Sequence, residues 1–293
     1  MRDAWRRFLR HRLAVLGLGV IAILVVLAVG AAVFSPHDPL RQDLPRALAG
    51  PSADFPLGTD EFGRCILSRI LYGARLSLLV GVIATGIGAS AGILSGLLAG
   101  YFPRVEGVVM RTMDVLLAFP SILLAIAIVA ALGPSLPNVM IAVGVRSIPS
   151  FARLTRSMVL GLRELEFVQG AQALGAGHPR ILFRHILPNG ISPLLVFSSM
   201  QVATAILLAA ILSFLGLGVQ PPTPEWGKMV SDGRSYLMEA PHVSLFPGLA
   251  IVLLVTGLTL LGEGLNETIN PVLRKRPRVK VDMSQSTEGT EPL

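Results

Sequence analysis

The sequence predicts an all-α integral membrane protein with six transmembrane helices. Hydrophobic residues make up 52% of the 293 residues and charged residues only 15%, which is too little polar surface to cover a soluble core. The apolar residues gather in uncharged runs long enough to cross about 30 Å of hydrocarbon as helices. The net charge of +7 comes from residues that flank these runs, not from one basic patch with interleaved aromatic residues, so the sequence argues against nucleic-acid binding.

The first run, residues 13–34, follows a basic N-terminal segment, residues 1–12. A signal peptide has a shorter apolar region of about 7–15 residues, so we expect a retained first helix. Residues 35–75 then form an outer segment. Its first part contains five prolines, which predict an extended loop. Its second part is amphipathic and predicts a helix lying at the membrane interface. The apolar residues fall on one face of this helix: Phe62, Ile66, Leu67, Ile70 and Leu71. The polar residues lie elsewhere on the helix: Arg64, Ser68, Arg69 and Arg75.

Residues 76–266 are expected to form a core of five helices. The apolar runs that define them are residues 76–102, 115–132, 138–160, 191–215 and 243–262. The fourth run is the least regular, because it contains Arg146, Arg153 and Arg156. Between the helices lie a loop at 163–189 and an outer loop at 217–242, and the tail 267–293 is first basic and then of disordered composition.

The distribution of lysine and arginine predicts that both termini are cytoplasmic. These residues concentrate at 1–12, around Arg104 and Arg111, at 152–190, and in the tail. Cytoplasmic flanks of membrane helices retain positive charge during insertion. The loop at 163–189 is therefore also expected on the cytoplasmic side.

Small residues recur every four positions in the second apolar run. They are Gly88, Gly92, Gly96 and Gly100, with Ala84 before them. Such a stripe allows another helix backbone to approach closely, which is how membrane helices associate without a hydrophobic driving force. We expect this run to be a central packing helix.

Ionisable residues within membrane helices are candidates for function. Arg111 and Asp114 are three residues apart and could pair with each other. An interfacial role and a gating role are the two alternatives for this pair, and the same holds for Arg146. Pro120 and Pro149 permit kinks where a pathway could open, or are ordinary packing kinks. No acidic residue lies near the middle of a run, which argues against a proton-coupled transporter.

Catalytic motifs are absent from the sequence, so we expect no enzyme activity in this chain. Gly227-Lys228 is followed by Met229, and Pro222 stands where the first glycine of a phosphate loop would be. The histidines have no metal-ligand spacing, and the single Cys65 excludes a cysteine-based metal cage. The sequence therefore predicts no cofactor or metal bound by this chain.

The loop at 163–189 predicts two short helices at an angle. Glu164 and Glu166 suit a helix N-terminus, Gly175 and Gly177 end that helix, and Pro179 suits the first turn of the next. A mere connector would contain polar turn residues instead of small and apolar ones. The small residues are Gly170, Ala171, Ala173 and Ala176. We therefore expect a docking element for a partner protein.

This loop resembles the signature of binding-protein-dependent ABC importer permeases, E-A-A-x3-G-x9-I-x-L-P. Gln169, Gly170 and Ala171 take its first three positions, and Gly175 takes its glycine. Gln169 replaces the acidic residue of the signature. The remaining positions that the resemblance assigns to the coupling loop are Glu166, Ala173, Leu174, Ala176, His185, Leu187 and Pro188.

The resemblance extends over nearly the whole chain, to the second permease of the peptide and nickel branch. The strings that carry it include PLGTDEFGR, SRILYGARLSLLVG, MDVLLAFPSILLAI, LFRHILPN and SFLGLGVQPPTPEWG. It implies a type I ABC importer permease in a bacterial inner membrane. The implied partners are a homologous second permease subunit, two cytoplasmic ATPase subunits that bind ATP and Mg²⁺, and an extracytoplasmic substrate-binding protein.

The resemblance implies import of di- or oligopeptides, with nickel chelates or glutathione as the alternative cargo. A different class, a self-sufficient secondary transporter or channel, would need a coupling site inside the bilayer and would show ion-driven flux in liposomes. The sequence does not identify the ligand or the residues that line the pathway.

Overall fold

A computed structural model describes residues 11–269, and most of the basic N-terminus and of the tail lies outside these residues, at 1–10 and 270–293. The described part is helical, with one isolated bridge between Thr59 and Cys65. Its elements are α2 (Arg12–Val29), α3 (Ala31–Phe34), η1 (Leu44–Arg46), α4 (Ile66–Tyr101), α5 (Pro103–Ala118), α6 (Ser121–Leu132), α7 (Leu136–Arg163), α8 (Glu166–Ala173), α9 (His178–Arg180), η2 (Ile181–Ile186), α10 (Leu187–Phe214), α11 (Trp226–Gly233), η3 (Arg234–Tyr236) and α12 (His242–Ile269).

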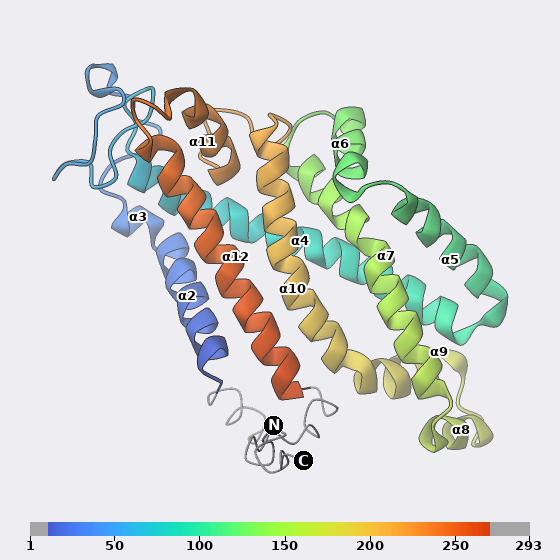
Figure 1. Ribbon diagram of the computed structural model, residues 1–293. Coiled ribbons are helices and arrows are strands. Elements are labelled where there is room, and N and C mark those ends of the chain that lie inside the picture. The colour runs from blue at the N-terminus through green and yellow to red at the C-terminus, as the bar shows by residue number, and fades with distance from the viewer. Residues whose placement is uncertain (1–10, 270–293) are drawn as a thin grey trace, which may run out of the picture.

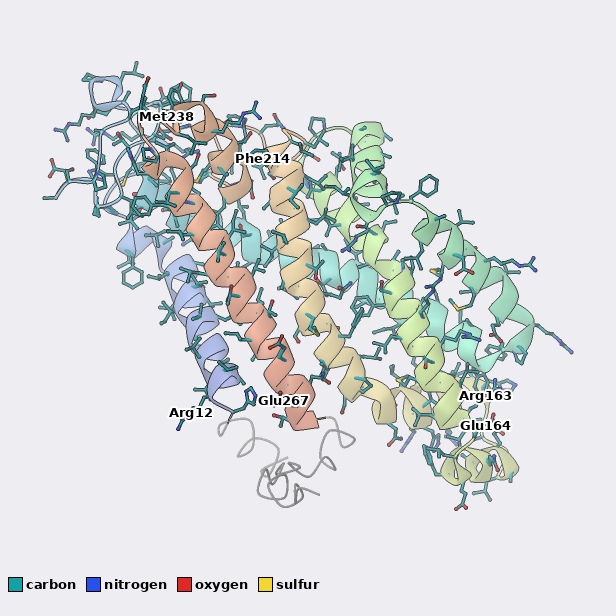
Figure 2. All side chains as sticks on the ribbon, viewed as in Figure 1. Arg12, Arg163, Glu164, Phe214, Met238 and Glu267 are labelled. Carbon is teal, nitrogen blue, oxygen red and sulfur yellow. The ribbon has the colours of Figure 1, made fainter. Side chains whose placement is uncertain are left out.

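The long helices form a bundle with two distinct ends (Figure 1). Helices α2, α12 and α10 run side by side, and α4 packs against all three and against α7. The loop between α3 and α4, together with α11, lies at one end, and α8 lies at the other. His11 Nε2 lies 2.8 Å from Glu267 Oε2, and this contact joins the first and last helices of the described chain. Glu267 lies at the same end of the bundle as α8 (Figure 2).

The contact between α4 and α7 contains the glycine stripe of the second apolar run. Gly88, Gly92, Gly96 and Gly100 are all buried in this contact. A Cβ added to Gly92 would lie 2.6 Å from the carbonyl oxygen of Ile148 on α7. Only hydrogen at the glycine Cα lets two helix backbones approach this closely. The glycine stripe therefore mediates a contact within this chain, between α4 and α7.

The first span ends earlier than the apolar run that predicts it. Helix α2 stops at Val29, and the chain turns at Gly30 before the short helix α3. Arg75 of α4 donates hydrogen bonds to the carbonyl oxygens of Ala28 and Val29, at 2.5 and 2.8 Å. Both carbonyls lie in the last turn of α2, so Arg75 caps the C-terminus of this helix.

The expectation of a separate interfacial helix at 60–75 is wrong. Its second half forms the first turns of α4, which runs without a break from Ile66 to Tyr101. The assignment of faces is also wrong, because Arg64 and Arg69 are each only 4% exposed while Phe62 is 42% exposed. Internal ion pairs and carbonyl oxygens, described below, solvate these two guanidinium groups in place of water.

The third apolar run belongs to two helices, where the sequence predicts one helix that Pro120 could kink. Helices α5 and α6 meet at Phe119 and Pro120 with a bend of 92°. Four described helices are long and apolar enough to cross a membrane, and the bent pair would make five if it forms one span. Helix α7 is long enough, but it carries the three arginines at 146, 153 and 156.

Candidate functional site: the α8 loop and the outer ion-pair network

Helix α8 projects from the end of the bundle but is attached to it by one apolar side chain. Figure 2 shows Arg163 and Glu164 at the junction of α7 with this helix. Val168 is fully buried, in a small core that also contains Leu97 of α4 and Val159 of α7. Ile181 and Ile186 of the following helix complete this core. The position of α8 is therefore determined by three of the long helices.

The opposite face of α8 is open. Phe167 is 42% exposed and Leu174 is 90% exposed, and no atom lies within 4 Å of a Cβ built on Gly170. Packing inside the chain thus does not require glycine at this position. The small and apolar residues of this face leave room for another protein surface to approach the α8 backbone.

Several residues of the predicted coupling loop lie on this open face, and others do not. Glu166, Gln169 and Ala173 are exposed, whereas Ala171 and Ala176 are half-buried. The amide of Gln169 donates a 3.2 Å hydrogen bond to the carbonyl oxygen of Glu164. Gln169 therefore binds the preceding turn of its own chain.

Gly175 makes the turn that follows α8. Its φ of 78° lies in the left-handed region, and nothing lies within 4 Å of a Cβ built there. Backbone conformation alone therefore requires glycine at this position. The next helix begins at His178, with Pro179 in its first turn, as the sequence predicts.

The second helix of the loop is not a separate short helix. It runs from His178 to Phe214 as one long helix, through the π-helical segment η2 that contains His185. Leu187 and Pro188 lie at the start of α10, directly after this segment. The second half of the loop is consequently an extension of α10 and would move with that helix.

A hollow of about 740 Å³ separates α8 from the end of α4. Tyr101 and His178 share a 3.0 Å hydrogen bond in its wall, and Phe102 packs edge-on against both rings. Arg163 donates to the carbonyl oxygen of Gly100 at 3.1 Å. These contacts join the start of the helix that begins at His178 to the end of α4.

The ionisable residues of the predicted third and fourth spans pair differently from the sequence-based expectation. Asp114 of α5 accepts a hydrogen bond of 2.6 Å from Arg153 of α7, not from Arg111. Glu106, nearer the start of α5, pairs with Arg156. Two ion pairs therefore link the broken span to α7. Arg146 is half-buried and has no ion pair among the described residues.

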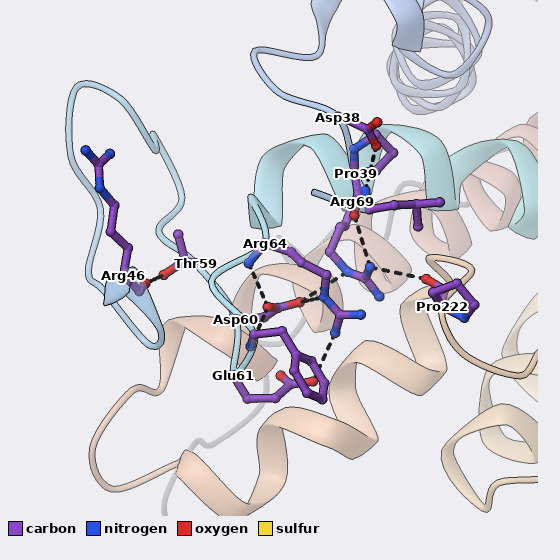
Figure 3. A network of polar contacts seen from close by, with 11 residues as sticks. Asp38, Pro39, Arg46, Thr59, Asp60, Glu61, Arg64, Arg69 and Pro222 are labelled. Carbon is purple, nitrogen blue, oxygen red and sulfur yellow. Dashed lines mark hydrogen bonds and ion pairs between the residues drawn. The ribbon is translucent and has the colours of Figure 1, made fainter. Parts of the chain in front are cut away.

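A second polar cluster lies at the other end of the bundle, in the loop before α4 (Figure 3). Asp60 accepts hydrogen bonds from Arg64 Nε at 2.6 Å and from the backbone N–H groups of Phe62 and Arg64 at 3.0 and 2.9 Å. Arg64 also donates to Glu61 at 3.0 Å. Loss of hydration and the neighbouring Asp60 raise the pKa of the Glu61 carboxyl above its ordinary value.

Arg69 joins this cluster to two distant segments. Its Nε lies 3.4 Å from Asp60 Oδ2. Its Nη1 donates to the carbonyl oxygens of Pro39 and Pro222, at 3.2 and 3.4 Å. One guanidinium group thus fastens the loop after α3 and the loop before α11 to the start of α4. We call Asp60, Glu61, Arg64 and Arg69 the outer network.

Helix α11 is held in place beside the outer network. Trp226 is buried, and its ring N–H donates to the carbonyl oxygen of Ile70 at 2.9 Å. Glu225 caps the helix by accepting from the Lys228 N–H at 2.8 Å. Burial raises the pKa of the Glu225 carboxyl above its ordinary value.

Replacing Asp60 by asparagine is expected to destabilise the outer end strongly. The change leaves two buried guanidinium groups with only Glu61 as a counter-ion, and breaking a buried pair in this way costs about 3–5 kcal/mol. The matched control is Asp54→Asn, because Asp54 is 72% exposed and pairs with Arg46 at 3.4 Å. Thermal unfolding of the purified complex should show a large loss of stability for the first variant alone. Equal shifts for the two variants would contradict the assignment.

The outer network, at the end of the bundle away from α8, is not evident as a site from the sequence alone. The available signal was the spacing of Asp60 and Arg64, four residues apart, and the presence of charges between apolar residues. The carbonyl partners of Arg69 were not visible in the sequence, because they lie 30 and 153 residues away. Across residues 11–269, no group of three histidine, cysteine or acidic residues could hold a metal ion.

Comparison with known proteins identifies the family. Residues 88–275 match the family described as the binding-protein-dependent transport system inner membrane component. Residues 1–51 match the N-terminal TM domain of oligopeptide transport permease C. The first match covers more than half of the chain, and it includes α5 to α12 and the α8 loop.

Curated relatives align over nearly the whole chain. The dipeptide transport system permease protein DppC of Alkalihalophilus pseudofirmus is 46% identical over 274 residues, which cover 93% of this chain and 90% of that protein. The glutathione transport system permease protein GsiD of Pectobacterium atrosepticum is 46% identical, with coverages of 93% and 91%. The di/tripeptide transport system permease protein DppC of Pseudomonas aeruginosa is 44% identical, with coverages of 94% and 93%.

A solved structure shares the fold. A chain of the inward-facing MetNI methionine ABC transporter aligns with a TM-score of 0.55 and 16% identity, over 68% of this chain and 95% of that chain. The family match, the identity to the curated relatives and the fold agree with one another. The chain belongs to the inner membrane components of binding-protein-dependent transport systems, as a multi-pass ABC importer permease of the dipeptide and oligopeptide permease C type.

Proposed function

We propose that this chain forms half of the translocation pathway of an ATP-driven importer of small peptides. Relatives of 44–46% identity are named as dipeptide, di/tripeptide and glutathione permeases, which supports a peptide as cargo. Glutathione is itself a small peptide derivative, so it is the second candidate. The binding protein that delivers the cargo is expected to select between them.

The coupling role is supported by the two faces of α8, one packed against the bundle and the other exposed. Val168 fixes this helix to three membrane helices, while Phe167 and Leu174 remain exposed. We propose that the open face docks on one of two cytoplasmic ATPase subunits, which bind ATP and Mg²⁺. Movement of the ATPases would reach the membrane through Gly175 and the helix that starts at His178.

The topology completes the proposal. We propose six spans, in which α5 and α6 together form the third and α7 the fourth. Both termini and α8 are placed in the cytoplasm of a bacterium, and the outer network lies outside the inner membrane. Their positions at opposite ends of the bundle support this arrangement (Figure 1). A homologous permease would supply the other half of the pathway.

Uptake measurements in cells that lack this chain test the cargo. Loss of labelled dipeptide uptake, restored by the intact gene, is the expected result. Loss of glutathione uptake alone would favour the second candidate. Unchanged uptake of both would contradict the proposed function, as would ion-driven flux through the purified chain alone in liposomes.

A further inference from the structure

Helix α7 carries a polar stripe along most of its length. Its members recur at intervals of four, three and four residues, a spacing that places them on one helical face. We call this set the α7 polar stripe: Arg146, Ser150, Arg153 and Ser157. All four side chains are at least partly exposed, whereas the opposite face of α7 is buried against α4 through residues such as Phe151 and Thr155.

With α7 as the fourth span, as proposed above, the α7 polar stripe lies at the depth of the hydrocarbon region. A rise of about 1.5 Å per residue places Arg153 roughly 15 Å from Arg163 at one end of α7, and Arg146 roughly 15 Å from Leu136 at the other. These positions are near the middle of a layer about 30 Å thick. Charged groups at this depth almost always face a water-filled cavity or the interior of a bundle.

Helix α5 continues the polar surface beside this stripe. Asp114 pairs with Arg153, and the two side chains are 59% and 56% exposed. Arg111 is also exposed, three residues before Asp114. Val108 and Val115, at 71% and 61% exposed, lie three residues before and four residues after Arg111, so the charged and apolar exposed residues of α5 adjoin each other. Asp114 thus extends the polar surface of α7 onto α5.

We propose that the α7 polar stripe lines a water-filled pathway and that Arg146 binds the carboxylate of a peptide passing along it. The carboxylate assignment rests on the proposed cargo, and the pathway rests on the proposed placement of α7 as the fourth span. Arg153 and Arg156 already have acidic partners, but Arg146 has none among the described residues. A half-buried guanidinium group within a span requires an anionic partner or water. A C-terminal carboxylate is an anion that such peptides share.

Thiol labelling in the assembled transporter tests the pathway. Cys65 is 1% exposed and is replaced by serine to give a background without cysteine. Ser150→Cys and Ser157→Cys are expected to react with membrane-impermeant charged methanethiosulfonates in at least one nucleotide state. Ile23→Cys on α2 and Val252→Cys on α12, which are exposed apolar positions away from charged residues, are the matched controls and should not react. Absence of labelling at both serine positions, or equal labelling at the controls, would overturn the pathway.

The charge of the labelling reagent tests Arg146. The thiol in Ser150→Cys should prefer an anionic over a cationic methanethiosulfonate, because Arg146 is one helical turn away. Adding Arg146→Gln should lower this rate ratio about tenfold, and Arg146→Lys should preserve it. The ratio at Ser157→Cys, three turns from Arg146, should hardly change. A ratio at Ser150→Cys that is insensitive to Arg146→Gln would overturn the role of this arginine.

Protection by peptide identifies the group that Arg146 binds. A dipeptide delivered by its binding protein during turnover should slow labelling of Ser150→Cys, and its C-terminal amide should protect several-fold less. Arg146→Gln should abolish this difference. Equal protection by the amide would overturn the carboxylate assignment. If no peptide is transported while the charge preference persists, the proposed cargo and the carboxylate assignment fail and the pathway stands.

Discussion

A Gly175→Val permease is expected to assemble normally but to import far fewer peptide molecules per ATP hydrolysed. The native φ of 78° is unfavourable for a β-branched residue, and holding it there costs about 1–3 kcal/mol. A shift of the turn to an ordinary conformation would change the angle between α8 and the helix that begins at His178. We expect a loss of about tenfold in the ratio of uptake to hydrolysis. Proteoliposomes containing the whole complex allow both rates to be measured.

The control for this prediction is Gly161→Val. Gly161 lies in α7 just before the loop, is exposed, has no atom within 4 Å of an added Cβ and has no positive φ. The same side chain there adds the same bulk without backbone strain, so uptake per ATP should remain close to the native ratio. A native ratio for Gly175→Val as well would remove the proposed role of the turn.

A Gly96→Leu permease is expected to fail at an earlier stage, in folding. A Cβ at this position would lie 2.5 Å from the carbonyl oxygen of Ala152 and 2.6 Å from Cβ of Thr155. Both atoms belong to the α7 helix, which cannot yield without moving away from α4. Overpacking typically costs about 1–3 kcal/mol, and a contact between two backbones lies at the upper end of that range. The yield of monodisperse complex in detergent should fall several-fold.

The same helix supplies the control for this variant. Gly86 is exposed on the opposite side of α4, with nothing within 4 Å of an added Cβ. Gly86→Leu should therefore leave the yield and the thermal stability of the complex nearly unchanged. Similar losses for Gly86→Leu and Gly96→Leu would indicate that leucine is tolerated poorly anywhere on α4, and not that the contact with α7 is critical.

The features that the sequence predicted correctly depend on local rules. Backbone groups in hydrocarbon must bond within their own segment, so a long apolar run becomes a helix whatever surrounds it. The glycine spacing on α4 and the turn at Gly175 follow from steric rules of similarly short range. These rules were sufficient for most helices, for the packing face of α4 and for the position of α8.

The incorrect expectations depended on partners far away in the chain. Arg69 is buried because carbonyl groups of Pro39 and Pro222 meet it, and an amphipathic pattern alone cannot reveal such partners. Asp114 pairs with Arg153 across two helices, although Arg111 is nearer in sequence. The sequence predicted a short second helix in the loop, yet the π-helical segment carries this helix into α10 without a break.

The helix from His178 to Phe214 acts as a lever arm that begins beside the open face of α8. Its 37 residues correspond to a rod of roughly 55 Å, so a tilt of about 5° at the α8 end would displace the far end by roughly 5 Å. That far end is attached, because Ser231 of α11 donates to the carbonyl oxygen of Phe214 at 2.7 Å. A tilt of a few degrees imposed at the α8 end would thus displace α11, at the opposite end of the bundle, by several ångströms.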